Sequence, residues 1–418
     1  MALLRMAVEN YRCFKERQEI ELRPITVVLG KNNSGKSALT RLPLLLESGI
    51  RTDSNLPLDL DSLGDDPPDY LDLVYGRNVH RALRLEFVTD DEDAVPTEVK
   101  ATIQNVDERR TQFVREFEIN TGHHHAQLDW VVGDESGHDY MLTVDGHVPS
   151  VKLRPAFRGL IPLTLELPER LRAALTLLPQ HLGNIRYLSS YRQRPSRLVR
   201  LPSRSQKEVG AAGENAAGML VDDHVRGGHA LLDELNRLLG DNLTGWRLEV
   251  EPQGPMYAIS LCSLSNPDLT VNLLDSGTGV AQVLPLLVQL AYDRKEPSHT
   301  GVLHVIEEPE LHLHPAFHAL LADLFIAGMD GGRSRFLVET HSETMLLRLR
   351  RRIAEGRISS GDVAIYFVDH GEGSSRVRRI EVDGLGNLDY WPSGVFSEDF
   401  EETKKLAEAQ FARERDES

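Results

Sequence analysis

The alternation of apolar and polar residues predicts that the chain begins with strands. Residues 4–12 alternate as a half-buried strand does, and residues 19–30 predict a strand pair that ends in the apolar run from Ile25 to Leu29. A helix is expected from about Lys36 to Glu47. Residues 30–37 therefore form a loop between a buried strand and a helix.

The middle of the chain follows a different pattern, of short strands separated by polar turns. Residues 52–72 are acidic and rich in proline and glycine, which predicts a surface loop, and residues 82–165 predict a β-rich insertion. Further elements are expected: helices at 165–180 and 229–240, strands at 246–252, 256–262, 269–274 and 335–340, a buried strand at 301–308 between two helices, a hairpin near 363–382, and a charged helical tail after Ser397.

Composition narrows the class of protein. The 418 residues, 40% of them hydrophobic, suffice for one large α/β unit with an insertion or for two compact units. A net charge of −17 argues against a surface coated in nucleic acid, although one local basic groove stays possible. With only Cys13 and Cys262, no disulfide framework is expected. We see no signal peptide and no apolar run of bilayer length, and therefore expect a soluble, cytoplasmic protein.

Residues 30–37, GKNNSGKS, fit the pattern G-x-x-x-x-G-K-[ST] of a phosphate-binding loop. Gly30 and Gly35 allow backbone N–H groups to face phosphate oxygens, and the helix N-terminus adds partial positive charge. Lys36 would reach the β- and γ-phosphates, and Ser37 would place its hydroxyl on Mg²⁺. The alternative is a plain glycine-rich turn. The predicted ATP-binding residues are Gly30, Lys31, Asn32, Asn33, Ser34, Gly35, Lys36, Ser37 and Ala38.

The apolar run at 302–306 is typical of a buried parallel strand, and it ends in Glu307 and Glu308. Two such charges are costly in a core unless a cation meets them, and the Mg²⁺ of a bound nucleotide would supply that cation. Glu307 would then hold Mg²⁺, directly or through water. Glu308 would orient and deprotonate the attacking water. The alternative is a strand that merely ends in solvated acids.

Taken together, these motifs resemble a known family. The ABC-type ATPases grouped with RecF, SMC proteins and OLD nucleases have nucleotide motifs and a switch segment similar to VENYRCFKE…VVLGKNNSGKS near the N-terminus, IEEPELHLHP at 306–315 and RFLVETHSE at 335–343. A bacterial subfamily labelled as AAA ATPases has segments similar to YLSSYRQRP at 187–195, GENAAGML at 213–220 and YWPSGVFSED at 390–399. The resemblance implies an α/β fold, a P-loop ABC-type ATPase domain with a β-rich insertion.

The resemblance also implies a second half of the site. Residues 275–282, DSGTGVAQ, lie in the place of the ABC signature. Ser276 and the amides around Gly277 and Gly279 would then cap the γ-phosphate held by a second subunit, in a head-to-tail dimer, and glycine would permit the close approach. His341 would contact the γ-phosphate and the attacking water. A helix-entry turn without a ligand, and a purely structural His341, remain the alternatives.

From these motifs the chain is expected to divide into four parts. The first two are residues 1–50, with the phosphate-binding loop, and residues 51–180, the β-rich insertion or arm. Residues 181–396 would carry the signature, the carboxylate strand and the switch histidine, and residues 397–418 a charged tail. The catalytic set that the resemblance implies is Glu308, His341 and Lys36, with Ser37 and Glu307 on the metal.

Some features of the families that the motifs resemble are missing from this sequence, and this narrows the range of expected functions. Too few residues follow His341 for a Toprim nuclease domain, and heptad arms of the SMC type are absent. The resemblance then implies a Mg²⁺-dependent ATPase in a DNA-associated or phage-defence system, with an effector such as a nuclease in trans. The alternative is an ATP-locked scaffold or sensor with little turnover. A transporter domain is disfavoured because the signature is not of the LSGGQ type.

Two further clusters of polar residues are candidates for ligand contacts. Residues 186–207 are rich in arginine and contain no acid, which predicts a groove that binds DNA or phosphate. The alternative is that these arginines pair with acidic segments of the chain or with a partner protein. The three histidines at 123–125 indicate a polar loop rather than a metal site. The basic residues of the segment are Arg186, Arg192, Arg194, Arg197, Arg200, Arg204 and Lys207, with Tyr187 and Tyr191 between them.

Overall fold

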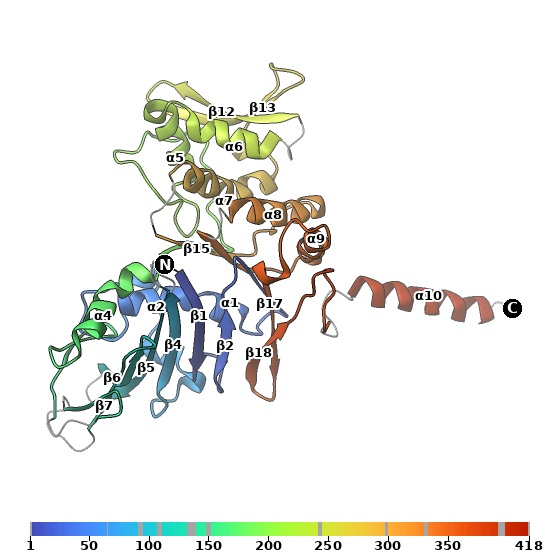
Figure 1. Ribbon diagram of the computed structural model, residues 1–418. Helices are drawn as coiled ribbons and strands as arrows, with labels where there is room; N and C mark the ends of the chain where they lie inside the picture. Colours follow the sequence, from blue (N-terminus) through green and yellow to red (C-terminus); the bar gives the residue numbers. More distant parts are fainter. Residues whose placement is uncertain are drawn as a thin grey trace.

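Two β-sheets and the helices around them organise the chain (Figure 1). The computed structural model describes residues 2–64, 66–90, 95–106, 111–131, 139–147, 152–240, 245–296, 300–329, 333–391 and 398–416. Within the resembling segment at 390–399, residues 392–397 lie outside the described residues, as does Ser397 at the start of the predicted tail.

A six-stranded sheet forms the centre, in the order β11-β15-β16-β3-β17-β18. Its neighbouring strands are parallel except for the antiparallel hairpin of β17 and β18. The carboxyl ends of β15, β16 and β3 therefore lie side by side. The strands are β3 (Ile25–Gly30), β11 (Asn184–Leu188), β15 (Val302–Glu307), β16 (Ser334–Glu339), β17 (Val363–Gly371) and β18 (Ser374–Ile380).

An antiparallel seven-stranded sheet has the order β2-β1-β4-β5-β6-β7-β8. Because β1 pairs with β4, the strands expected as an insertion continue the sheet that the N-terminal strands begin. The strands are β1 (Ala2–Glu9), β2 (Gln18–Glu21), β4 (Leu83–Asp90), β5 (Pro96–Val106), β6 (Thr111–Asn120), β7 (His125–Trp130) and β8 (Tyr140–Val144).

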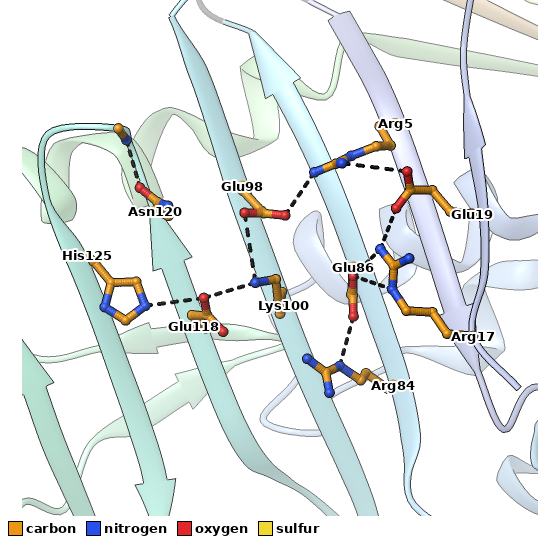
Figure 2. Close-up of polar contacts among 11 residues, drawn as sticks. Arg5, Arg17, Glu19, Arg84, Glu86, Glu98, Lys100, Glu118, Asn120 and His125 are labelled. Atoms are coloured by element: carbon orange, nitrogen blue, oxygen red, sulfur yellow. Dashed lines mark hydrogen bonds and ion pairs between the residues drawn. The ribbon is translucent and has the colours of Figure 1, made fainter.

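One face of this sheet carries a ladder of opposite charges (Figure 2). Glu86 pairs with Arg17 and Arg84, and Lys100 pairs with Glu98 and Glu118. Alternate residues of the same strands point into the core, as a period of two requires. The charges on this face therefore largely compensate one another.

Helices and two small sheets complete the fold. The helices are α1 (Lys36–Thr40), α2 (Leu42–Ile50), α3 (Tyr70–Leu73), α4 (Glu169–His181), α5 (Ala216–Asp222), α6 (Ala230–Gly240), α7 (Thr278–Lys295), α8 (Pro315–Gly328), α9 (Glu343–Ala354) and α10 (Glu398–Asp416). The remaining strands are β9 (Ala156–Arg158) and β10 (Ile161–Leu163), which pair, and β12 (Trp246–Gln253), β13 (Met256–Ser263) and β14 (Thr270–Asn272).

The single helix expected from Lys36 to Glu47 is wrong in one respect, because it is two helices that meet at Arg41. Pro43 explains the break. Its ring nitrogen cannot donate to the carbonyl of Leu39, and its ring would clash with that carbonyl in a continuous helix. Arg41 consequently caps α2, beside the phosphate-binding loop.

The central sheet separates two hydrophobic cores. Val28 of β3 packs into the core that contains α1, α2 and the seven-stranded sheet. Val27 and Leu29 point the other way, into the core built with α5 to α9. Figure 1 shows these two layers on opposite sides of β15 and β17. The predicted α/β P-loop fold is confirmed, and its strand ends define one edge where polar groups gather.

Candidate nucleotide site

The predicted loop connects β3 to α1 in a conformation that depends on glycine. Gly35 has a φ of +105°, and a Cβ atom there would lie 2.3 Å from the Sγ of Cys13. A Cβ atom on Gly30 would lie 2.4 Å from the carbonyl oxygen of Val368. Asn33 also has a positive φ, of 61°. At both glycines the loop therefore lies too close to neighbouring residues to admit a side chain.

The loop offers unpaired donors to an anion. The hydroxyl of Ser34 is buried and has no hydrogen-bond partner among the described residues. Lys36 donates from Nζ to the carbonyl oxygen of Lys31 at 2.8 Å, and no ion pair joins it to a carboxylate in the described part of the chain. Burial lowers the pKa of Lys36, while Glu339, Glu308 and Glu310 raise it. These groups fit a phosphate, which would partner the ammonium and the hydroxyl.

Glu308 and His341 meet at the ends of neighbouring strands. Oε1 of Glu308 lies 3.5 Å from Nε2 of His341, and their side chains are 28% and 37% exposed, so a bound molecule can reach both. Glu308 has a φ of +41°, a conformation that non-glycine residues rarely adopt outside functional sites. Burial, and then the charge of Lys36, lower the pKa of His341, while Glu308 opposes this. The imidazole is therefore neutral at pH 7.

Glu310, to which the sequence pattern assigned no role, holds the backbone at His341. Its Oε1 accepts hydrogen bonds from the hydroxyl of Thr340 at 2.7 Å and from the amide of His341 at 2.6 Å. Its Oε2 is buried without a partner among the described residues, and burial raises the pKa of Glu310. The signal was the third acid of the sequence EEPE, directly after the predicted pair.

Glu307 meets an arginine where the sequence predicted only a metal ion. Nε and Nη2 of Arg41 donate to its two carboxylate oxygens, at 2.5 and 2.8 Å, and Glu307 is 2% exposed. The hydroxyl of Ser37 does not donate to Glu307. It donates to Oε1 of Glu339, at 3.0 Å. Neither Arg41 nor Glu339 belongs to a motif that would have predicted these contacts from the sequence.

The predicted signature segment occupies the start of α7. Gly277 caps the helix and is exposed, and a Cβ atom there would meet nothing within 4 Å. Ser276 donates from its hydroxyl to the carbonyl of Leu273 at 2.8 Å. Gly279 lies against the chain itself, since a Cβ atom there would be 3.1 Å from the carbonyl oxygen of His312. The turn at Ser276 and Gly277 thus faces open space.

Part of the basic segment is used inside the chain. Arg186 pairs with Glu208 and Asp293, and Arg197 pairs with Asp275 through two hydrogen bonds. Arg186 is largely buried by its ion pairs and is therefore lost to the predicted groove, whereas the Arg197 side chain is 58% exposed and stays at the surface.

Arg192 is a second side chain of the basic segment that is used inside the chain. It donates to the carbonyl oxygens of Gln282 and Glu307 at 3.0 Å, and burial lowers its pKa to about 10. A contact with DNA stays a prediction for the exposed basic residues of the segment, which are Arg194, Arg197, Arg200, Arg204 and Lys207.

The histidines at 123–125 include two that are paired within the seven-stranded sheet. His124 lies 3.0 Å from Asp145, and His125 lies 3.2 Å from Glu118. These contacts agree with a polar loop.

Across the described residues, no helix is long and apolar enough to cross a membrane.

Comparison with protein families gives two matches. The model of an AAA ATPase domain matches residues 1–107 and 231–346, together just over half of the chain, and that of a protein of unknown function, DUF3696, matches residues 358–406. The first match includes the phosphate-binding loop, Glu308 and His341. No curated protein matches the chain.

Several solved structures are similar to the whole chain. The SMC head domain from Thermotoga maritima is 14% identical with a TM-score of 0.42, over 91% of this chain and 100% of that one. An SmcHead bound to the C-terminal winged-helix domain of ScpA is 13% identical with a TM-score of 0.45, over 91% and 98%. An Smc head domain with an extended coiled coil, bound to a ScpA domain derived from Pyrococcus furiosus, is 11% identical with a TM-score of 0.45, over 91% and 96%.

Proposed function

The chain belongs to the family of AAA ATPase domains, as its nucleotide motifs implied, and on this premise we propose that it binds ATP with Mg²⁺ at residues 30–37 and hydrolyses the γ-phosphate. One observation carries the proposal. Lys36, Glu308 and His341 converge at the carboxyl ends of three adjacent strands, where Glu308 lies 3.5 Å from His341 and burial, and then the charge of Lys36, lower the pKa of His341. A phosphate-binding loop alone would support binding only.

Each of these side chains has a separate task in the proposed reaction. Lys36 spreads the charge of the β- and γ-phosphates. Glu308 orients a water molecule and accepts its proton. His341 donates a hydrogen bond from its imidazole to the γ-phosphate or to the water. Mg²⁺, when bound with ATP, supplies further positive charge to the leaving phosphate oxygens.

We also propose that a second copy of the chain completes the site. Gly277 is exposed at the N-terminus of α7, an eighteen-residue helix whose first amides can receive an anion. The hydroxyl of Ser276 lies beside it. A head-to-tail dimer would place this turn over the nucleotide of the partner. An ATP-driven role in a DNA-associated or phage-defence system, with an effector in trans, stays a prediction.

Steady-state phosphate release by the full chain tests the proposal. Glu308→Gln keeps the shape of the side chain and removes the base, so turnover should fall about a hundredfold or more. Its affinity for a fluorescent ATP analogue should stay near the wild-type value. Glu169→Gln, an exposed position at the start of α4, is the matched control and should turn over as the wild type does.

The outcomes separate the two functions that the sequence allows. Turnover by the wild type that Glu308→Gln abolishes supports an ATPase. Wild-type protein that binds ATP but barely turns it over would instead support the ATP-locked scaffold. Equal turnover by Glu308→Gln and wild type would remove Glu308 from the role of general base.

A further inference from the structure

Glu339 is a carboxylate of the candidate site, and it lies on the strand next to the one that leads into the phosphate-binding loop. Strand β16, which ends at Glu339, lies between β3 and β15. Glu339 is therefore the direct register partner of Val28 on one side and of Glu307 on the other. Glu307, which ends β15, is one strand farther from the loop.

Both oxygens of Glu339 face hydroxyl groups of α1. Oε1 accepts from Ser37 at 3.0 Å, and Oε2 accepts from Thr40 at 3.1 Å. The side chain is buried, with the residue 4% exposed. No arginine or lysine of the described residues forms an ion pair with it. Its negative charge is therefore held by hydrogen bonds and lacks a direct counter-ion.

Glu307 differs because its charge is already compensated. Arg41 donates two charge-assisted hydrogen bonds to it, and the same guanidinium lies over the ring of Tyr187, 5.8 Å from its centroid. A cation that bound Glu307 directly would have to replace both hydrogen bonds, which are the strong kind. The structure thus gives Glu307 a partner and leaves Glu339 available.

The arrangement of Ser37 and Glu339 suits a divalent cation. Mg²⁺ prefers carboxylate and hydroxyl oxygens in an octahedron, in which neighbouring ligand oxygens lie about 3 Å apart. The Ser37 and Glu339 oxygens already have this separation. Glu307 and Glu339 are register partners on adjacent strands, so a cation at Glu339 would also reduce the repulsion between their like charges.

We propose that Ser37 and Glu339 together supply the protein ligands of the divalent cation that accompanies the nucleotide, while Glu307 fixes Arg41 beside α1. This assignment rests on the proposed function, because the cation arrives with ATP. It differs from the sequence-based expectation, which gave the metal to Ser37 and Glu307.

The test uses Mn²⁺ as the probe and a non-hydrolysable ATP analogue as the nucleotide. Free Mn²⁺ is measured by electron paramagnetic resonance during titration of the full chain, so the readout does not depend on turnover. Glu339→Gln should weaken Mn²⁺ binding at least about tenfold. Glu307→Gln should weaken it less. Glu118→Gln, on β6 of the other sheet, is the matched control and should leave it unchanged.

Binding of the analogue in the presence of a chelator checks that each variant is folded, and it should match the wild type. A larger loss in Glu307→Gln than in Glu339→Gln, or wild-type Mn²⁺ affinity in Glu339→Gln, would overturn the assignment. Failure of the proposed function would look different, because the wild type itself would then bind no nucleotide.

Discussion

His304 is a histidine at the centre of β15 that the nucleotide site does not use. It is 2% exposed, and its ring stacks on Phe336 with centroids 4.9 Å apart. Its Nε2 has no hydrogen-bond partner among the described residues, although Oδ2 of Asp293 lies 3.6 Å away. Burial, and then the charge of Arg186, lower the pKa of His304 to about 3. The folded protein therefore holds this ring neutral.

This residue predicts a loss of stability in mild acid. The unfolded chain takes up a proton at His304 below a pH of about 6.5, whereas the folded chain does not until about 3. The neutral His304 therefore lowers the free energy of unfolding only below a pH of about 6.5, and by more as the pH falls further. At pH 5 the loss is about 2 kcal/mol. His304→Leu removes it, so thermal melting at pH 7.5 and pH 5 should show a smaller acid shift in the variant.

His123→Leu provides the control for this comparison, because His123 is exposed. Its melting temperature should fall with pH as that of the wild type does. An equal acid shift in His304→Leu and wild type would mean that His304 is not held neutral in the fold.

At the level of single residues, the sequence indicated the candidate site residues that belong to contiguous motifs. The loop at 30–37 is contiguous, so its spacing alone indicates how it meets a phosphate. Glu308 and His341 each close a recognisable strand. Arg41 and Glu339 could not be assigned, because their contacts join residues far apart in sequence and depend on which strands are adjacent.

At the level of elements, the order of strands decides what the motifs do. The sequence predicted β15 and β16 as buried strands, but periodicity carries no information about which of them lies beside β3. Since β16 does, Glu339 and not Glu307 is close to Ser37.

The basic segment shows the same limit. Composition cannot distinguish an arginine that faces solvent from one, such as Arg192, that donates to buried carbonyl groups. The sequence alone therefore left both interpretations of residues 186–207 open, and the fold assigns individual side chains to one of them.

The charge ladder of the seven-stranded sheet yields a prediction about stability (Figure 2). Glu86 is its most buried acid, with a side chain 8% exposed, and it accepts hydrogen bonds from Nε and Nη2 of Arg17 at 3.0 and 2.7 Å. Glu86→Ala leaves Arg17 and Arg84 without this partner, and both are partly exposed and can hydrate. We expect the free energy of unfolding, measured in urea, to be lower than that of the wild type by about 1–3 kcal/mol.

Glu116→Ala is a matched change on the neighbouring part of the sheet. The Glu116 side chain is 41% exposed in its ion pair with Arg115, so its removal should cost less than about 1 kcal/mol. An equal loss of stability in both variants would show that burial of Glu86 adds nothing to the strength of its ion pairs.

At the level of the whole molecule, the phosphate-binding loop and the proposed signature turn pack with different cores. The loop and α1 pack with the core that contains the seven-stranded sheet, whereas α7 packs with the core of α5 to α9. The exposed turn at Ser276 and Gly277 thus belongs to a different layer from Lys36. A site shared between two copies would require an exposed helix start of this kind.

Mixing two inactive variants tests whether the site is shared. Lys36→Ala disables the phosphate-binding loop, and Ser276→Arg blocks the signature turn with a long side chain, so neither variant alone should hydrolyse ATP. In a mixed head-to-tail dimer, one site combines the two lesions, while the other combines an intact loop with an intact turn. Phosphate release should therefore return to about a quarter of the wild-type rate in an equal mixture, since half of the dimers are mixed and each has one working site. If each chain used its own turn, the mixture would stay inactive, because no chain would carry both intact halves.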